Sequence, residues 1–186
     1  MNPNRVIISL AVLFLLSITM GCYTAYKTAR DPRSVETQAS DQKITTKIQG
    51  KLAGEEGLAI FDIAVQVYYG RVFLVGEYGN EDDRDTAIKL AKKTEGVREV
   101  STYLLPKREV EGCGTGSGLK LNATINKRLV QADDVVHSRI NVEMVQCNAV
   151  LLGVVADDRE RNRAIEIARG VEGVRKVKSF LMVEPR

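Results

Sequence analysis

Three cysteines and a single histidine are the residues best suited to chemistry in this chain of 186 residues. The cysteines are Cys22, Cys113 and Cys147, and they do not have the spacing of metal ligands. His137 would need an activated serine or cysteine and an orienting acid to act as a general base. Asp62, Asp133 and Asp134 form no paired-carboxylate signature that is repeated elsewhere in the chain. The sequence therefore predicts no enzyme, no metal site and no cofactor.

The position of Cys22 predicts attachment of lipid. Residues 1–21 begin with a basic residue, Arg5, and continue with an apolar run from Val6 to Leu16, which is typical of an export signal. The run is shorter than the roughly 20 residues that a membrane-spanning helix needs. Cys22 follows it directly and resembles the lipidated cysteine of a bacterial lipobox, although Thr19 stands where leucine is usual. An ordinary cleaved signal or an uncleaved anchor is the alternative.

The other two cysteines are candidates for a disulfide. Export would place them in an oxidising compartment, where disulfides persist. Cys113 lies in a Gly-rich segment that can bend, and Cys147 lies in the predicted turn of a hairpin. The bond would close a loop of about 34 residues and contribute roughly 3–4 kcal/mol in the loop-entropy model. Two free thiols are the alternative.

An internal repeat organises the rest of the chain. The stretch from Arg84 to Val100 matches the stretch from Arg161 to Val177 without a gap, at an offset of 77 positions. The match continues upstream at the same offset. A period this long indicates two copies of one small domain rather than a solenoid. Domains of about 65 residues bury modest cores, so neither copy has room for a deep catalytic cleft.

Each copy is predicted to contain, in order, a helix, two strands, a helix and a strand. In the first copy Asp41 is the expected N-cap of the first helix. A hairpin is expected over residues 61–76, a second helix after its cap Asn80, and a last strand over 97–105. The spacing of every fourth residue marks the buried face of the first helix, at Ile44, Ile48 and Leu52 and again at Leu121, Ile125 and Leu129. This order predicts an α+β fold in which two helices cover one face of a three-stranded sheet.

The predicted segments are a signal peptide over 1–21, a lipid-anchored tether over 22–40, a first domain over 41–106, a Gly-rich linker over 107–118 and a second domain over 119–186. Net charge differs between the domains, at −2 for the first and +3 for the second. The second domain is therefore the better candidate to meet an anionic partner. The linker lacks the lysine and hydroxyl residue of a phosphate-binding loop.

Two local motifs of the repeat resemble the BON-domain family. Each copy ends its second helix with Gly-Val-x-x-Val and ends its hairpin with a hydrophobic residue and a glycine, at Gly96, Gly173, Val75-Gly76 and Leu152-Gly153. The tether sequence Asp31-Pro-Arg-Ser-Val-x-Thr-Gln38 is similar to that of dual-domain lipoproteins in this family. The resemblance implies a non-enzymatic, lipid-anchored outer-membrane protein that faces the periplasm. It also implies binding of anionic phospholipid and a role in envelope integrity.

The resemblance places the membrane contact on the first helix of the second domain, residues 119–131. With its apolar stripe in the core, the outer faces would carry cations and spare apolar residues, namely Leu119, Lys120, Lys127, Arg128 and Val130. Such a mixture suits a helix that lies on an anionic surface. A rival surface is the lysine stripe of the first domain, Lys43, Lys47 and Lys51, which is also explained as an ordinary solvated face.

A second class of function stays open, in which the protein is an adaptor that docks envelope-assembly proteins through exposed sheet faces or edges. Nucleic acid is not an expected partner, because the net charge is small and no basic platform rich in aromatic residues exists. No small-molecule substrate is expected either. Tyr68 and Tyr69, at the tip of the first hairpin, could stack on a partner or simply pack.

Overall fold

The computed structural model describes residues 31–55 and 62–184. The predicted signal peptide, the lipidation site Cys22 and the rest of the predicted tether up to residue 30 lie outside these residues. Chain contacts group Pro32–Arg186 into one compact unit, which contains both repeats. No helix in the described ranges combines the length and apolar character needed to cross a membrane.

The elements of the first repeat are α2 (Val35–Ala53), β1 (Ile63–Tyr68), β2 (Arg71–Tyr78), α3 (Glu81–Lys92) and β3 (Glu99–Pro106). Those of the second are α4 (Thr115–Val130), the short 3-10 helix η2 (His137–Arg139), β4 (Ile140–Val145), β5 (Asn148–Val155), α5 (Asp158–Arg169) and β6 (Lys176–Val183). The predicted order of helices and strands is confirmed in both copies.

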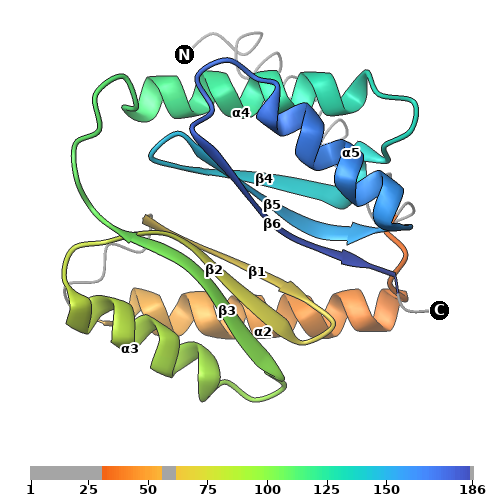
Figure 1. Ribbon diagram of the computed structural model, residues 1–186. Coiled ribbons are helices and arrows are strands. Elements are labelled where there is room, and N and C mark those ends of the chain that lie inside the picture. The colour runs from red at the N-terminus through yellow and green to blue at the C-terminus, as the bar shows by residue number, and fades with distance from the viewer. Residues whose placement is uncertain (1–30, 56–61, 185–186) are drawn as a thin grey trace, which may run out of the picture. The chain divides into compact units, whose positions relative to one another are not determined.

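Each repeat forms its own three-stranded sheet, ordered β1-β2-β3 and β4-β5-β6. The first pair of strands in each sheet is antiparallel and the second pair is parallel. The pairing is the same in both copies, with Ile63 opposite Gly76 and, 77 positions later, Ile140 opposite Gly153. Two helices cover one face of each sheet (Figure 1), as the α+β prediction required.

The first helix of each repeat begins earlier than predicted. Ser34 is the N-cap of α2, and its hydroxyl accepts a hydrogen bond from the amide of Thr37 at 3.2 Å. The prediction that Asp41 is the N-cap was therefore wrong, because Asp41 lies two turns inside the helix and is buried. In the second repeat, α4 includes the four residues before Leu119, which the sequence analysis assigned to the linker.

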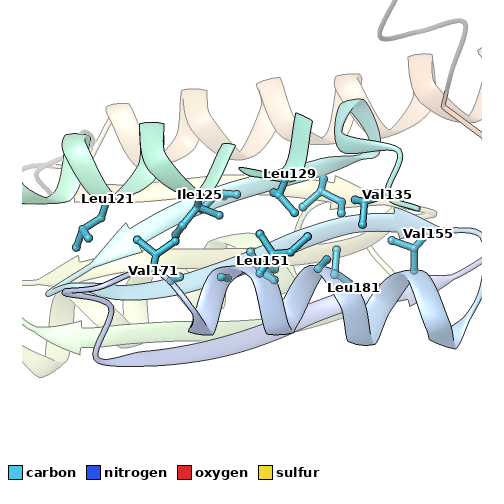
Figure 2. Close-up of a cluster of buried hydrophobic side chains, with 14 of the residues drawn as sticks. Leu121, Ile125, Leu129, Val135, Leu151, Val155, Val171 and Leu181 are labelled. Atoms are coloured by element: carbon cyan, nitrogen blue, oxygen red, sulfur yellow. The ribbon is translucent and has the colours of Figure 1, made fainter. Parts of the chain in front are cut away.

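A separate hydrophobic core fills the space between the helices and the sheet of each repeat. Figure 2 shows the core of the second repeat, where Leu121, Ile125 and Leu129 of α4 point toward Leu151 and Leu181 of the sheet. Ile44, Ile48 and Leu52 occupy the matching positions in the first repeat. The predicted buried stripes of both helices are confirmed.

The glycine at the end of each hairpin is explained by a close crossing of backbone. A Cβ atom on Gly76 would lie 1.8 Å from the carbonyl oxygen of Asp62, and one on Gly153 would lie 2.0 Å from that of Arg139. Both distances are far below any allowed contact. The chain can therefore enter the first strand of each hairpin only because these two positions carry no side chain.

The tips of the two hairpins have the same backbone conformation, but different interactions hold them in place. Both central residues of each turn have positive φ, at Tyr69 and Gly70 and at Gln146 and Cys147. In the first repeat the carboxylate of Asp41 accepts hydrogen bonds from the amides of Tyr69 and Gly70, each at 2.8 Å. In the second repeat a disulfide joins Cys147 to Cys113, with their Cα atoms 5.5 Å apart.

The sheet faces that carry no helices pack against each other. A third buried cluster draws residues from both repeats, and it consists of Tyr68, Phe73, Val75, Val145, Val150, Leu152 and Val154. The rings of Phe73 and Phe180 lie 5.2 Å apart across this contact. As a result every residue of β5 is buried. The two repeats therefore share a core, although each also has its own.

Polar groups bridge the two repeats at the margin of this contact, and one of these contacts joins equivalent positions. The side-chain amide of Gln66 donates to the carboxylate of Glu143, its counterpart 77 positions later, at 3.4 Å. Asn141 donates to the hydroxyl of Tyr68 at 2.7 Å. A contact between equivalent positions is the pattern of an isologous, two-fold interface. Tyr68 is therefore a packing residue and not free to stack on a partner.

Candidate functional site

The outer face of α4 is the surface where exposed apolar and cationic side chains come together. Leu119, Ala123, Lys127 and Val130 follow the spacing i, i+4, i+8 and i+11, so they lie along one face of the helix. All four are exposed, and Lys120 flanks them. Leu119 and Val130 are 68% and 58% exposed, and the other large hydrophobic residue with such exposure in the described ranges is Val35. We call these five residues the α4 stripe.

The ammonium groups of the α4 stripe are available for a ligand. Neither Lys120 nor Lys127 forms an ion pair or a side-chain hydrogen bond with the residues that the structure describes. Ala123 was not among the predicted site residues. Its position four residues after Leu119 places it on the same face of the helix, and this spacing could have identified it. Its small side chain leaves the neighbouring Leu119 and Val130 prominent on the surface.

Arg128 does not belong to this face. It lies about 100° around the helix from Lys127, and its guanidinium donates to the carbonyl oxygen of Gly170 at 2.7 Å. Gly170 ends α5, so this bond caps a helix C-terminus, where a cation is favourable. The structure thus brings together four of the five predicted contact residues and gives the fifth a role between α4 and α5.

The groove beside the start of α4 has the opposite charge character. Acidic residues outnumber basic ones in its lining, which contains Asp62, Glu77, Glu109, Glu111 and Glu143 against Lys107 and Arg108. Burial raises the pKa of the Glu143 carboxyl, and the hydrogen bond from Gln66 opposes this shift. This excess of carboxylates favours an anionic ligand less than the outer face of α4 does.

The rival lysine stripe on α2 is partly engaged within the protein. Lys47 pairs with Glu95 at 2.8 Å, and Lys51 donates to the hydroxyl of Thr94 at 2.9 Å. Lys43 is exposed. Among the residues of α2, the one exposed large apolar side chain is Val35, which lies at the N-terminal end of the helix and away from Lys47 and Lys51. This surface therefore lacks the mixture that the α4 stripe presents.

The remaining candidates do not assemble into a reactive centre. His137 lies in η2, partly buried, and forms no side-chain hydrogen bond with a serine, cysteine or carboxylate in the described ranges. The same ranges contain no cluster of histidine, cysteine and acidic residues that would hold a metal ion. The geometry supports a binding surface.

One premise of the adaptor hypothesis is contradicted. It expected exposed sheet faces, but the two helix-free faces are buried against each other. The physical reason is that β2 and β5 carry continuous apolar runs, which need cover on both sides. Of the docking surfaces that the hypothesis named, the outer strand edges remain.

The family model of the BON domain matches this chain over residues 40–105 and again over 119–185. The matched ranges correspond to the two repeats. They extend over more than half of the chain.

Three bacterial relatives are similar to this chain over most of its length. The chain is 30% identical to the outer membrane lipoprotein DolP of Haemophilus influenzae, over 84% of this chain and 81% of the relative. It is 33% identical to the osmotically-inducible protein Y of Escherichia coli, over 76% and 71%. It is also 28% identical to a 21 kDa hemolysin of Actinobacillus pleuropneumoniae, over 79% and 76%.

Among solved structures, the chain is similar to CdsD, a structural protein of the type III secretion system of Chlamydia trachomatis. The identity is 16% and the TM-score is 0.33. The match covers 78% of this chain and 64% of that chain, which is just under two thirds of its length.

Proposed function

Because the chain belongs to the BON-domain family and contains two copies of that domain, we propose that it is an outer-membrane lipoprotein that faces the periplasm and binds anionic phospholipid through the α4 stripe. The relative named as an outer membrane lipoprotein supports the location, since it matches over most of both chains. The observation that carries the binding proposal is the exposure of Leu119 and Val130 beside two lysines that have no side-chain partner among the described residues. The proposed role is non-enzymatic and supports the integrity of the outer membrane.

The anchor of the proposed lipoprotein is Cys22, which would be acylated, with palmitate as one of its acyl chains, after removal of residues 1–21. Two or more acyl chains hold a protein on a membrane, at about 0.8 kcal/mol for each buried methylene group. Replacing Cys22 with alanine should release the protein from membranes and change its processing. An intact mass that shows an unmodified Cys22, or cleavage elsewhere, would contradict the anchor.

The energetics of the α4 stripe fit a protein that is already tethered. Each lysine near an anionic surface contributes about 1 kcal/mol. Full burial of a leucine or valine side chain contributes roughly 1.5–3 kcal/mol, and partial insertion between headgroups contributes less. Such a sum gives weak binding on its own. It suffices to orient a domain that the anchor holds at the surface, because the tether raises the local concentration.

The test uses the soluble chain without its N-terminal segment and vesicles with and without phosphatidylglycerol. The Lys120→Glu, Lys127→Glu variant should lose co-sedimentation with the anionic vesicles while its circular dichroism stays unchanged. The matched control reverses Lys43, Lys47 and Lys51 and should bind like the wild type. Loss of binding in the control and retention in the first variant would assign the contact to α2 instead.

A second variant separates insertion from charge. Leu119→Ser with Val130→Ser should weaken binding even at low salt, because it removes the apolar part of the contact. Binding that depends only on charge would be unaffected by this change and would fall steeply with ionic strength. In cells that lack the protein, the charge-reversed form should fail to restore resistance to detergent, whereas the α2 control should restore it.

A further inference from the structure

The first turn of α4 is poorly suited to be helical by its own sequence. It reads Thr115-Gly-Ser-Gly118, and each glycine costs about 1 kcal/mol relative to alanine in a helix. The N-cap is Gly114, which offers no side chain to accept a hydrogen bond from the first amides. No acidic residue lies in this turn to favour the positive end of the helix dipole. An interaction from outside the helix must therefore hold it.

The disulfide supplies that interaction. Cys113 directly precedes the N-cap of α4, so its bond to Cys147 fixes the chain at the point where the helix begins. Cys147 is 3% exposed and belongs to the core of the second repeat, against which Cys113 also packs. The corresponding helix α2 needs no such bond, because Ser34 caps it and Glu36 lies in its first turn.

The residue that follows this turn is Leu119, the most exposed apolar residue of the α4 stripe. We propose that the Cys113–Cys147 disulfide is a redox-sensitive clamp, whose reduction frays the first turn of α4 and thereby removes Leu119 from the membrane-binding face. The effect of the clamp on membrane binding rests on the proposed function. Its effect on the first turn of α4 does not depend on that function.

The reaction is an ordinary thiol–disulfide exchange with a dithiol reductant. A thiolate of the reductant attacks the sulfur of Cys113, which is the less buried cysteine, and Cys147 leaves as the thiolate and takes up a proton. The second thiol of the reductant then attacks the mixed disulfide and releases the thiol of Cys113. Two electrons pass to the protein, the reductant becomes a disulfide, and the buried thiol of Cys147 stays in the core.

Hydrogen exchange tests the effect on the helix without any membrane. The amide of Gly118 donates to the carbonyl of Gly114 at 3.0 Å, which makes it a reporter of the first turn. Reduction, or the Cys113→Ser, Cys147→Ser variant, should raise its exchange rate at least about tenfold, while amides of β5 stay protected. Equal exchange of the Gly118 amide in the oxidised and reduced protein would overturn the clamp.

Vesicle binding tests the consequence, with a rescue variant as the control. Reduction should weaken binding of the soluble chain to phosphatidylglycerol vesicles by about tenfold, the factor that corresponds to losing one partly inserted leucine. Gly116→Ala with Gly118→Ala should restore binding in the reduced state, since alanine favours helix. Both positions have room, because a Cβ on Gly116 meets nothing within 4 Å and one on Gly118 lies 3.8 Å from Met144.

The outcomes separate the clamp from the proposed function. If the oxidised wild type does not bind the vesicles, the proposed function fails. The clamp is then tested only by the hydrogen-exchange rate of the Gly118 amide in the oxidised and reduced proteins. If the oxidised and reduced proteins bind equally, the link between the clamp and the membrane is overturned. If reduction weakens binding and the alanine variant does not restore it, fraying of the helix is not the cause.

Discussion

Asp41 shows how a single buried carboxylate joins the segment before the first domain to the tip of a hairpin. Besides the two turn amides, it accepts a hydrogen bond from the guanidinium of Arg33 at 2.6 Å, and both side chains are almost fully buried. Arg33 also donates to the carbonyl of Val67 at 3.0 Å and lies over the ring of Tyr68. The tether sequence that resembles the family's lipoproteins therefore has a structural role in this fold.

Replacing Asp41 with asparagine should lower the free energy of unfolding by about 3 kcal/mol, because it removes the negative charge that pairs with the buried guanidinium of Arg33. Urea unfolding followed by circular dichroism would measure the loss. Asp133→Asn, at an exposed position, is the matched control and should change stability by less than about 0.5 kcal/mol. Equal effects of the two changes would mean that the buried pair is not stabilising.

Glu143 is a partly buried carboxyl, and its raised pKa predicts a pH dependence. Its raised pKa means that the folded protein binds this proton more tightly than the unfolded chain. Its contribution is therefore favourable at low pH and is lost as the pH rises through the pKa of the folded state. Glu143→Gln should remove this dependence and raise stability at neutral pH by up to about 1 kcal/mol. Urea unfolding from pH 4 to 8 would measure it, and a constant difference across that range would contradict the assignment.

At the scale of elements, the crossing at the end of each hairpin gives a sharp prediction. Gly153→Ala should cost roughly 3 kcal/mol or more, because the new Cβ would overlap the carbonyl of Arg139 and force the backbone of β4 away from β5. Thermal unfolding would measure the loss. Gly116→Ala in α4 is the control, since the same change there adds a methyl group in open space and should stabilise the helix.

The sequence predicted the elements well where one periodic face decides them. The stripe of Ile125 and its neighbours identified α4, and Asn80 was rightly taken as the cap of α3, where it accepts a hydrogen bond from the amide of Asp83. The start of α2 was missed because Asp41 has the right type for a cap but is needed for a contact with the distant hairpin tip. Local sequence does not reveal such a contact.

The candidate site was predictable in part. The buried stripe of α4 fixed which residues must face outward, and that placed Leu119, Lys127 and Val130 on the surface. The direction of Arg128 depends on the position of Gly170 in another helix, which no pattern within α4 contains. The start of the helix was also missed, because glycines at 116 and 118 argue for a linker when the nearby disulfide is not considered.

The whole molecule is held together by the contact between the two sheets. This contact is absent from the predictions above, although its signal is present in the sequence. The segments Val72-Phe-Leu-Val75 and Ala149-Val-Leu-Leu152 are continuous apolar runs instead of alternating ones. A strand that is buried on both faces gives this pattern. Because each central strand contributes to its own core and to the shared one, we expect the repeats to unfold together.

Phe73→Ala tests that expectation. Phe73 belongs to the first repeat, and its ring lies in the cluster that the two repeats share. Its removal should lower the free energy of unfolding by about 3–5 kcal/mol. If the repeats form one cooperative unit, native-state hydrogen exchange should show faster exchange in β5 of the second repeat as well as in β2. Val72→Ala, in the separate core of the first repeat, should affect both strands in the same way. Acceleration confined to the first repeat would show that the two unfold independently.

The pairing of Gln66 with its own counterpart, Glu143, has a consequence for how such a chain can change over time. Two identical subunits would have to accept every substitution twice, once on each side of their axis. Fusion of the halves into one chain removes that restriction. Here one half has a carboxylate that holds its hairpin turn and a slight excess of acids, while the other has a disulfide and a net positive charge. Duplication thus allows a symmetric scaffold to have two different outer surfaces.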